Sequence, residues 1–168
     1  MNLTDLVSAE RTLCRVEARC KKHALEIVSE LLASDTLSLT SGEIIRKLFQ
    51  REKIGSTYLG NSLAIPHAVV TDLRDAIAAI LILNEPIQFD DDQESPVSVI
   101  LSVLVPEEKS DTYDNLVRRI AQQFSDSSQL RRIQNATDKG DVLEQLANVN
   151  IDLEAITGVL PNLAQVAT

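Results

Sequence analysis

The stretch AIAAILIL, residues 76–83, is the most informative part of the chain for its fold. It is apolar throughout and lies between Asp75 and the turn-forming residues Asn84-Glu85-Pro86, which predicts a strand buried on both faces. The run VSVILSVLV at 97–105 predicts a second such strand. Residues 85–94 between the two runs include five acidic side chains, so we expect an exposed connection there.

Helical patterns lie on both sides of these strands in the sequence. Apolar residues recur at spacings of three and four, which is typical of helices with one packed face. Thr40 and Glu43 have the spacing of a capping box, and the helix that they begin is expected to end near Gln50. Residues 51–68 predict a loop with a short strand. The helices expected are 21–33, 40–50, 116–124, 127–135 and 138–147, the last capped by Asp138, and together with the buried strands they predict an α/β fold.

The chain length of 168 residues suits one domain with a sizeable core. Sixteen Lys and Arg against 25 Asp and Glu give a net charge of −9, which argues against nonspecific binding to nucleic acid or to an anionic membrane and favours a basic protein partner. The first ten residues lack the features of a secretory signal, and the longest apolar run is too short to span a bilayer. We therefore expect a cytoplasmic protein without membrane insertion.

Cofactor and metal sites are not predicted. The two cysteines, Cys14 and Cys20, and the two histidines are too dispersed to form a recognisable ligand set. In a reducing compartment both cysteines are expected to remain ordinary thiols.

His67 is the strongest candidate for chemistry. It closes the segment Gly60-Asn61-Ser62-Leu63-Ala64-Ile65-Pro66-His67. A neutral imidazole has an ordinary pKa of about 6.5, so it is a competent nucleophile near pH 7 and can take a phosphoryl group without a separate base. Backbone N–H groups in a loop of small residues could help to hold the phosphate oxygens, and Pro66 restricts the backbone just before the acceptor.

The residues around His67 resemble a known family. Arg51-Glu52-Lys53, Gly55 to Asn61 and Ala64-Ile65-Pro66-His67 are similar to the active-site signature of the fructose, mannitol and nitrogen class of enzyme IIA of the bacterial phosphotransferase system. The segments Lys21 to Ile27 and Leu104-Val105-Pro106 resemble the nitrogen-regulatory branch, whereas Thr57-Tyr58-Leu59-Gly60 is closer to the mannitol branch. The resemblance extends from about residue 3 to 149, which leaves 150–168 as a loosely held extension.

This resemblance implies a single domain with a mixed β-sheet flanked by helices on both sides. It also implies that His67 accepts the phosphoryl group and that Arg51, sixteen residues earlier, steadies the phosphate. Many relatives carry a second histidine where alignment puts Tyr113, which can donate a hydrogen bond but cannot become a cation near neutral pH. The sequence leaves open whether Tyr113 contacts phosphate or covers the edge of the core.

Three functional hypotheses follow from the resemblance. The leading one is a phosphoryl carrier, rather than a turnover enzyme, that receives phosphate from a histidine phosphocarrier protein and regulates targets such as a potassium transporter or a sensor kinase. The second is a fructose-type or mannitol-type enzyme IIA that supplies a separate sugar permease. The third is a binding module that no longer accepts phosphate because Tyr113 has replaced the second histidine.

Overall fold

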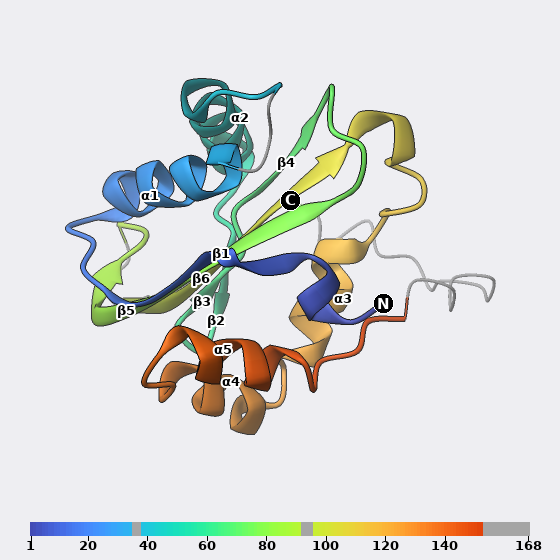
Figure 1. The fold of residues 1–168 in the computed structure, drawn as a ribbon. Coiled ribbons are helices and arrows are strands. Elements are labelled where there is room, and N and C mark those ends of the chain that lie inside the picture. Colours follow the sequence, from blue (N-terminus) through green and yellow to red (C-terminus); the bar gives the residue numbers. More distant parts are fainter. Residues whose placement is uncertain (35–37, 92–95, 153–168) are drawn as a thin grey trace.

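The computed structural model describes residues 1–34, 38–91 and 96–152. Within these residues the chain forms a six-stranded mixed sheet with the order β1-β5-β6-β3-β2, in which β4 also pairs with β6 (Figure 1). The predicted α/β class with a mixed sheet is thereby confirmed. The strands are β1 Val7–Val16, β2 Tyr58–Gly60, β3 Leu63–Ala64, β4 His67–Val70, β5 Ile77–Gln88 and β6 Pro96–Pro106.

The two apolar runs form the central antiparallel pair, β5 and β6. Their register runs from Ile77 opposite Leu104 to Gln88 opposite Pro96. The expected connection begins later than residue 85, because β5 continues to Gln88. Glu85 and Pro86 are exposed, as expected, whereas Ile87 and Phe89 are buried. Pro86 is tolerated within the strand because the register shifts between Ile82 and Ile87, where no regular ladder has to be maintained. Residues 92–95 of the expected connection lie outside the described residues.

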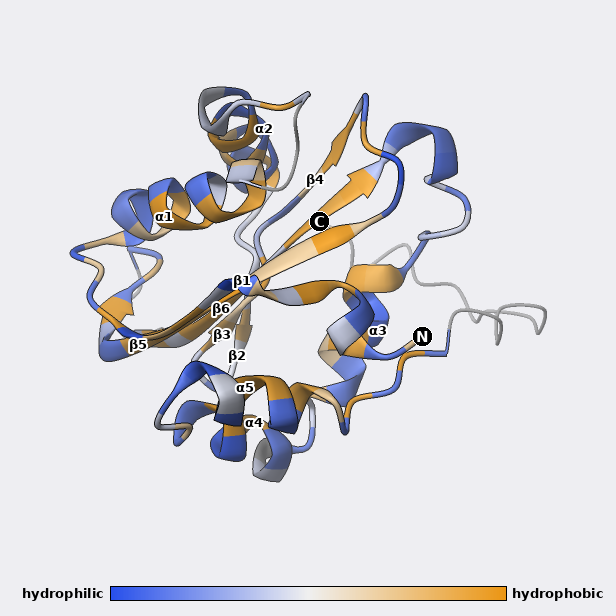
Figure 2. Ribbon diagram, viewed as in Figure 1, coloured by the Kyte–Doolittle hydropathy of each residue, from blue (hydrophilic) through white to orange (hydrophobic). Residues whose placement is uncertain are grey.

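Helices cover both faces of the sheet. One face packs against α1 Lys21–Ser34 and α2 Ser41–Ile54, and the other packs against α3 Leu116–Gln123, α4 Ser127–Gln134, α5 Lys139–Leu146 and the 3-10 turn η1 Leu3–Asp5. A second 3-10 turn, η2 Glu107–Lys109, follows β6. Figure 2 shows apolar colour concentrated in the sheet and on the helix surfaces that face it. Among the described helices, none combines the length and the apolar character needed to cross a bilayer.

The helix α2 begins as expected and ends later than expected. Thr40 caps it, with reciprocal hydrogen bonds between Thr40 and Glu43 that form a capping box. The helix does not stop near Gln50 but continues for another turn to Ile54, with Gly55 as its C-cap. That last turn carries Arg51, so the helix gives this side chain a fixed starting point.

The strand β1 was not anticipated from the sequence. It lies parallel to β5 at one end of the sheet order, and its polar residues Glu10 and Arg11 interrupt the apolar pattern. Arg11 is nevertheless buried, with 8% of its surface exposed. Its burial is tolerated because its guanidinium donates to the carbonyls of Ala78 and Leu6 at 3.0 Å each. A buried cation with satisfied donors is compatible with a strand next to the core.

The N-terminal residues pair with the last described segment. Leu3 N–H donates to the Val149 carbonyl at 3.0 Å and Ile151 N–H donates to the Met1 carbonyl at 2.7 Å, while Ile151 itself is buried. The division into a domain at 3–149 and an extension from residue 150 remains a prediction, and residues 153–168 lie outside the described part of the chain.

The central pair should dominate stability. Leu101 lies in β6 with no exposed side-chain surface, so Leu101→Ala should lower the free energy of unfolding by about 2–5 kcal/mol through lost burial and a residual cavity. The control Leu59→Ala removes the same atoms from a side chain that is 46% exposed, and it should change stability by roughly 0.5 kcal/mol or less. Urea unfolding of the three proteins measures both values. Equal losses in the two variants would contradict this assignment of the core.

Candidate functional site

The site begins at a break in the strand that runs along one edge of β6. The short strands β3 and β4 both pair in parallel with β6, β3 at Val99 and Ile100 and β4 from Val103 to Pro106. Between them lie Ile65 and Pro66, and a proline has no N–H to contribute to a ladder. His67 is the first residue of β4 and is half-buried there.

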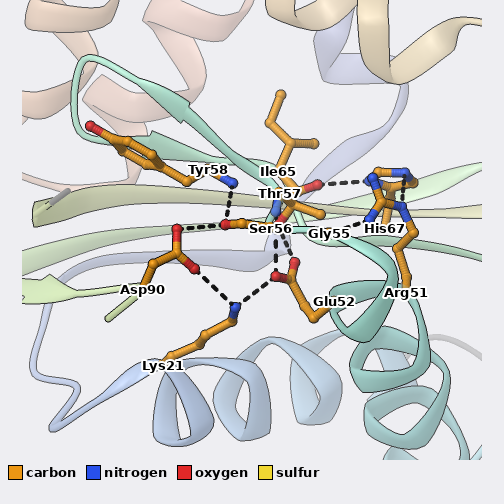
Figure 3. Close-up of polar contacts among 10 residues, drawn as sticks. All are labelled: Lys21, Arg51, Glu52, Gly55, Ser56, Thr57, Tyr58, Ile65, His67 and Asp90. Atoms are coloured by element: carbon orange, nitrogen blue, oxygen red, sulfur yellow. Dashed lines mark hydrogen bonds and ion pairs between the residues drawn. The ribbon is translucent and has the colours of Figure 1, made fainter. Parts of the chain in front are cut away.

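Two hydrogen bonds define the state of the His67 ring. Nδ1 lies 2.8 Å from the Ile65 carbonyl oxygen, and because a carbonyl can only accept, Nδ1 carries the proton. Arg51 Nε donates to His67 Nε2 over 3.2 Å, so Nε2 holds the lone pair (Figure 3). The ring is therefore held as the neutral tautomer with Nε2 as its nucleophilic atom.

Arg51 is fixed at both ends. Its backbone lies in the last turn of α2, and its Nη1 donates to the Gly55 carbonyl at 2.7 Å. A guanidinium held in this way can present a planar fork of donors to two oxygens of one phosphate. The structure thus brings together the two residues, His67 and Arg51, that the sequence singled out for phosphate chemistry.

The surroundings of His67 favour its neutral form. Burial is the main cause that lowers the pKa of His67 below its ordinary value of 6.5, and the positive charge of Arg51 acts in the same direction. The hydrogen bond to the Ile65 carbonyl and the negative charge of Glu52 oppose the shift without reversing it. Near neutral pH the neutral ring, with its proton on Nδ1, therefore predominates.

A polar network that the sequence analysis missed lies beside Arg51. The Glu52 carboxylate is 4% exposed and pairs with Lys21 Nζ at 2.7 Å. It also accepts hydrogen bonds from the Thr57 hydroxyl and, at 3.3 Å, from Thr57 N–H. Lys21 is 3.5 Å from Asp90, whose carboxylate accepts from the Ser56 hydroxyl at 2.6 Å (Figure 3). Glu52 and Thr57 fall within the quoted signature, but nothing in the linear pattern pairs them with Lys21, 31 residues earlier.

Tyr113 lies in the hydrophobic core. It follows η2, is 9% exposed and belongs to the core cluster beneath α3, α4 and α5. Val103, the register partner of His67, belongs to the same cluster. In the described part of the chain, the Tyr113 side chain makes no hydrogen bond with His67 or Arg51. The packing of Tyr113 is thus visible, and its contact with phosphate remains a prediction.

The described residues offer no group of three or more His, Cys, Asp or Glu side chains that could hold a metal ion. Cys14 and Cys20 are both free thiols. The arrangement of His67 and Arg51 offers a nucleophilic ring nitrogen beside a fixed guanidinium.

Comparison with known proteins identifies the family of this chain. Residues 5–149 match the family described as phosphoenolpyruvate-dependent sugar phosphotransferase system, EIIA 2. The nitrogen regulatory protein of Escherichia coli (strain K12) is 34% identical over 155 residues, 92% of this chain and 92% of that protein. The nitrogen regulatory protein of Klebsiella oxytoca is 32% identical over 156 residues, 92% of this chain and 96% of that protein.

A solved structure extends the comparison to the fold. The crystal structure of nitrogen regulatory protein IIA-Ntr from Neisseria meningitidis superposes with a TM-score of 0.79 at 29% identity, covering 86% of this chain and 98% of that one. The family match covers most of the chain and includes His67, Arg51 and the network around Glu52. The chain belongs to the EIIA 2 family of the phosphoenolpyruvate-dependent sugar phosphotransferase system.

Proposed function

We propose that this protein is a regulatory phosphoryl carrier that accepts phosphate on Nε2 of His67 from a histidine phosphocarrier protein. The observation that carries the proposal is the position of Arg51 Nε, 3.2 Å from an Nε2 that is free of a proton. Family membership implies phosphoryl-transfer partners, either a phosphocarrier or an enzyme IIB. Such a relay belongs in the cytoplasm, where we expect the protein to act.

The transfer step needs no base on this chain. The Nε2 lone pair attacks phosphorus, the Nε2–P bond forms, and the bond from phosphorus to the ring nitrogen of the donor histidine breaks. The electron pair of that bond stays with the donor nitrogen. Nδ1 keeps its proton and its bond to the Ile65 carbonyl, which stabilises the positive charge that develops on the ring. Arg51 exchanges its contact with Nε2 for contacts with phosphate oxygens.

The surface near His67 suits a protein donor. The side chains of Ile54, Leu59 and Val69 are 75%, 46% and 49% exposed, although each is large and apolar. Ile54 ends the helix that carries Arg51, and Val69 lies two residues beyond His67 on the same side of β4. Scattered exposed residues need no explanation, but two on the elements that carry Arg51 and His67, with Leu59 on β2, favour a docking surface there.

The regulatory role rests on the relatives and on charge. Both relatives reported above bear the name nitrogen regulatory protein. Their names favour the regulation of other proteins as the role of this chain, rather than the supply of phosphate to a sugar permease. Phosphorylation adds nearly two negative charges at the site, and that change can create or abolish binding of a target. Targets such as a potassium transporter or a sensor kinase fit this role. Supply of phosphate to a fructose or mannitol permease would use the same His67 chemistry and differ in the recipient.

The acceptor can be tested by intact mass. The protein is incubated with phosphoenolpyruvate, the first enzyme of the relay and its phosphocarrier, and it should gain one phosphate that is absent in His67→Ala. The exposed Arg46→Lys serves as the folded control and should still be phosphorylated. If the wild-type protein stays unmodified while a known acceptor in the same reaction is phosphorylated, the chain is a binding module instead.

We expect the function of Arg51 to require the planar pair of donors in its guanidinium and not only its positive charge. Arg51→Lys keeps the charge but loses the second donor and the bond to the Gly55 carbonyl. Loss of a hydrogen bond to a charged group is worth about 1.5–3 kcal/mol, so phosphorylation should slow roughly tenfold to a hundredfold. Quenched-flow measurement of phosphorylation gives the rate. Arg46→Lys, an exposed substitution in the same helix, should leave that rate unchanged.

The same assay addresses Tyr113. If Tyr113→Phe matches the wild-type rate, the hydroxyl has no part in transfer and the side chain serves the core. A slowed Tyr113→Phe would assign the hydroxyl to a phosphate contact.

The pH dependence follows from the depressed pKa of His67. The neutral, nucleophilic ring predominates above the folded pKa, and because that pKa is lowered from 6.5, more than half of the rings should still be neutral at pH 6.5. A titration of the His67 ring protons by NMR measures this midpoint directly on the unphosphorylated protein. A midpoint at or above 6.5 would contradict the burial and charge arrangement described here.

A further inference from the structure

We propose that Glu52 is a positioning residue for phosphoryl transfer, because its carboxylate holds the loop at residues 55–57. A carbonyl of that loop contacts Arg51 directly, and another reaches His67 through Ile65. The inference rests on the proposed role of His67 as acceptor. It adds the hydrogen bonds between the buried residues Glu52 and Thr57, which act on Arg51 and His67 without touching the phosphate.

The path from Glu52 to His67 is a chain of three hydrogen-bonded links. Glu52 accepts from the hydroxyl and the N–H of Thr57, which is 3% exposed. The Thr57 carbonyl accepts from Ile65 N–H at 3.0 Å. The Ile65 carbonyl in turn accepts from His67 Nδ1 at 2.8 Å and so selects the tautomer with Nε2 free.

The path from Glu52 to Arg51 uses the same loop. Gly55, two residues before Thr57, provides the carbonyl that accepts from Arg51 Nη1 at 2.7 Å. The positions of Arg51 and His67 therefore both depend on one short segment, residues 55–57. Glu52 holds that segment at Thr57, and Asp90 holds it at Ser56. A displacement of the segment would move the nucleophile and the phosphate-binding fork together.

Glu52 can be buried because its charge is compensated. Lys21 Nζ lies 2.7 Å from it, and the same ammonium lies 3.5 Å from Asp90 and 4.4 Å from the centre of the Phe89 ring. A buried carboxylate with an ion-pair partner and two further donors has its hydrogen-bonding capacity used. The network thereby joins the start of α1, the end of α2 and the segment just after β5 (Figure 3).

The test removes the links one at a time in the full-length protein. Thr57→Val keeps the shape of the side chain and removes the hydroxyl donor, whereas Thr57→Ser restores that donor. Glu52→Gln removes the charge at constant size, and Asp91→Asn removes one charge from the exposed neighbour of Asp90 as the matched control. Circular dichroism and thermal unfolding identify the variants that fold.

Two readouts separate positioning from simple stability. The first is the pair of ¹⁵N chemical shifts of the His67 ring, which report the tautomer and require no phosphate donor. The second is the phosphorylation rate at varied phosphocarrier concentration. We expect Thr57→Val and Glu52→Gln to shift the ring toward a mixture of tautomers and to lower the limiting rate roughly tenfold to a hundredfold at unchanged KM, since misplacement of about 1 Å has effects of that size. Thr57→Ser and Asp91→Asn should match the wild type.

The outcomes also distinguish this inference from the function on which it rests. Ring shifts and limiting rates that stay at wild-type values in folded Thr57→Val and Glu52→Gln would overturn it. A raised KM with unchanged ring shifts would also overturn it, because the loop would then serve docking. If the wild-type chain takes no phosphate, the phosphoryl-carrier function fails, while the ring shifts still decide whether Glu52 controls the tautomer.

Discussion

The arrangement of the molecule depends on the burial of β5 and β6 from both sides. The runs at 76–83 and 97–105 are apolar except for Ser98 and Ser102, so the pair has two apolar surfaces that must be covered if it is to be stable in water. The helices α1 and α2 cover one surface, and α3, α4, α5 and η1 cover the other. The site lies where the last turn of α2, which carries Arg51, meets β4, the neighbour of β6 that begins at His67. There the partner strand is broken into β3 and β4. At the break the Pro66 carbonyl still accepts from Val103 N–H of β6 at 2.9 Å, whereas the Ile65 carbonyl accepts from the His67 ring.

The break in the strand links fold and chemistry. In an unbroken strand, the Ile65 carbonyl would bond to a neighbouring strand, as backbone groups in sheets do. Here it accepts the Nδ1 proton of His67 two residues later, and Ile65 N–H donates to Thr57. The local backbone thus selects the ring tautomer, while the core behind β6 supplies the burial that disfavours protonation. In the proposed transfer, the nucleophile would thus be prepared before a donor arrives, so little reorganisation would be left for the transfer step.

Sequence patterns predicted the parts of this structure that depend on local periodicity or on a local motif. The doubly buried strands, the helices with one apolar face and the Thr40 capping box were all recognised, and His67 and Arg51 were placed together by a signature of seventeen residues. The errors lie where distant groups compensate for an unfavourable local pattern. Arg11 is accepted in β1 because carbonyls of Ala78 and Leu6 satisfy it, and Pro86 is accepted in β5 because the register shifts there. Lys21 and Glu52 form their pair only when α1 and α2 pack, which no linear spacing reveals.

The network around Glu52 bears on why this site would carry phosphate rather than hydrolyse it. Hydrolysis of a phosphohistidine is promoted by a base that activates water, and Glu52 is the carboxylate whose charge acts on His67. Both of its oxygens accept hydrogen bonds: Oε2 accepts from Lys21 Nζ and from Thr57 N–H, and Oε1 accepts from the Thr57 hydroxyl. A water molecule that approached these oxygens would have to compete with the hydrogen bonds that they already accept. The same contacts that would position the loop would therefore withhold a base from the site, which is the combination that a carrier of labile phosphate requires.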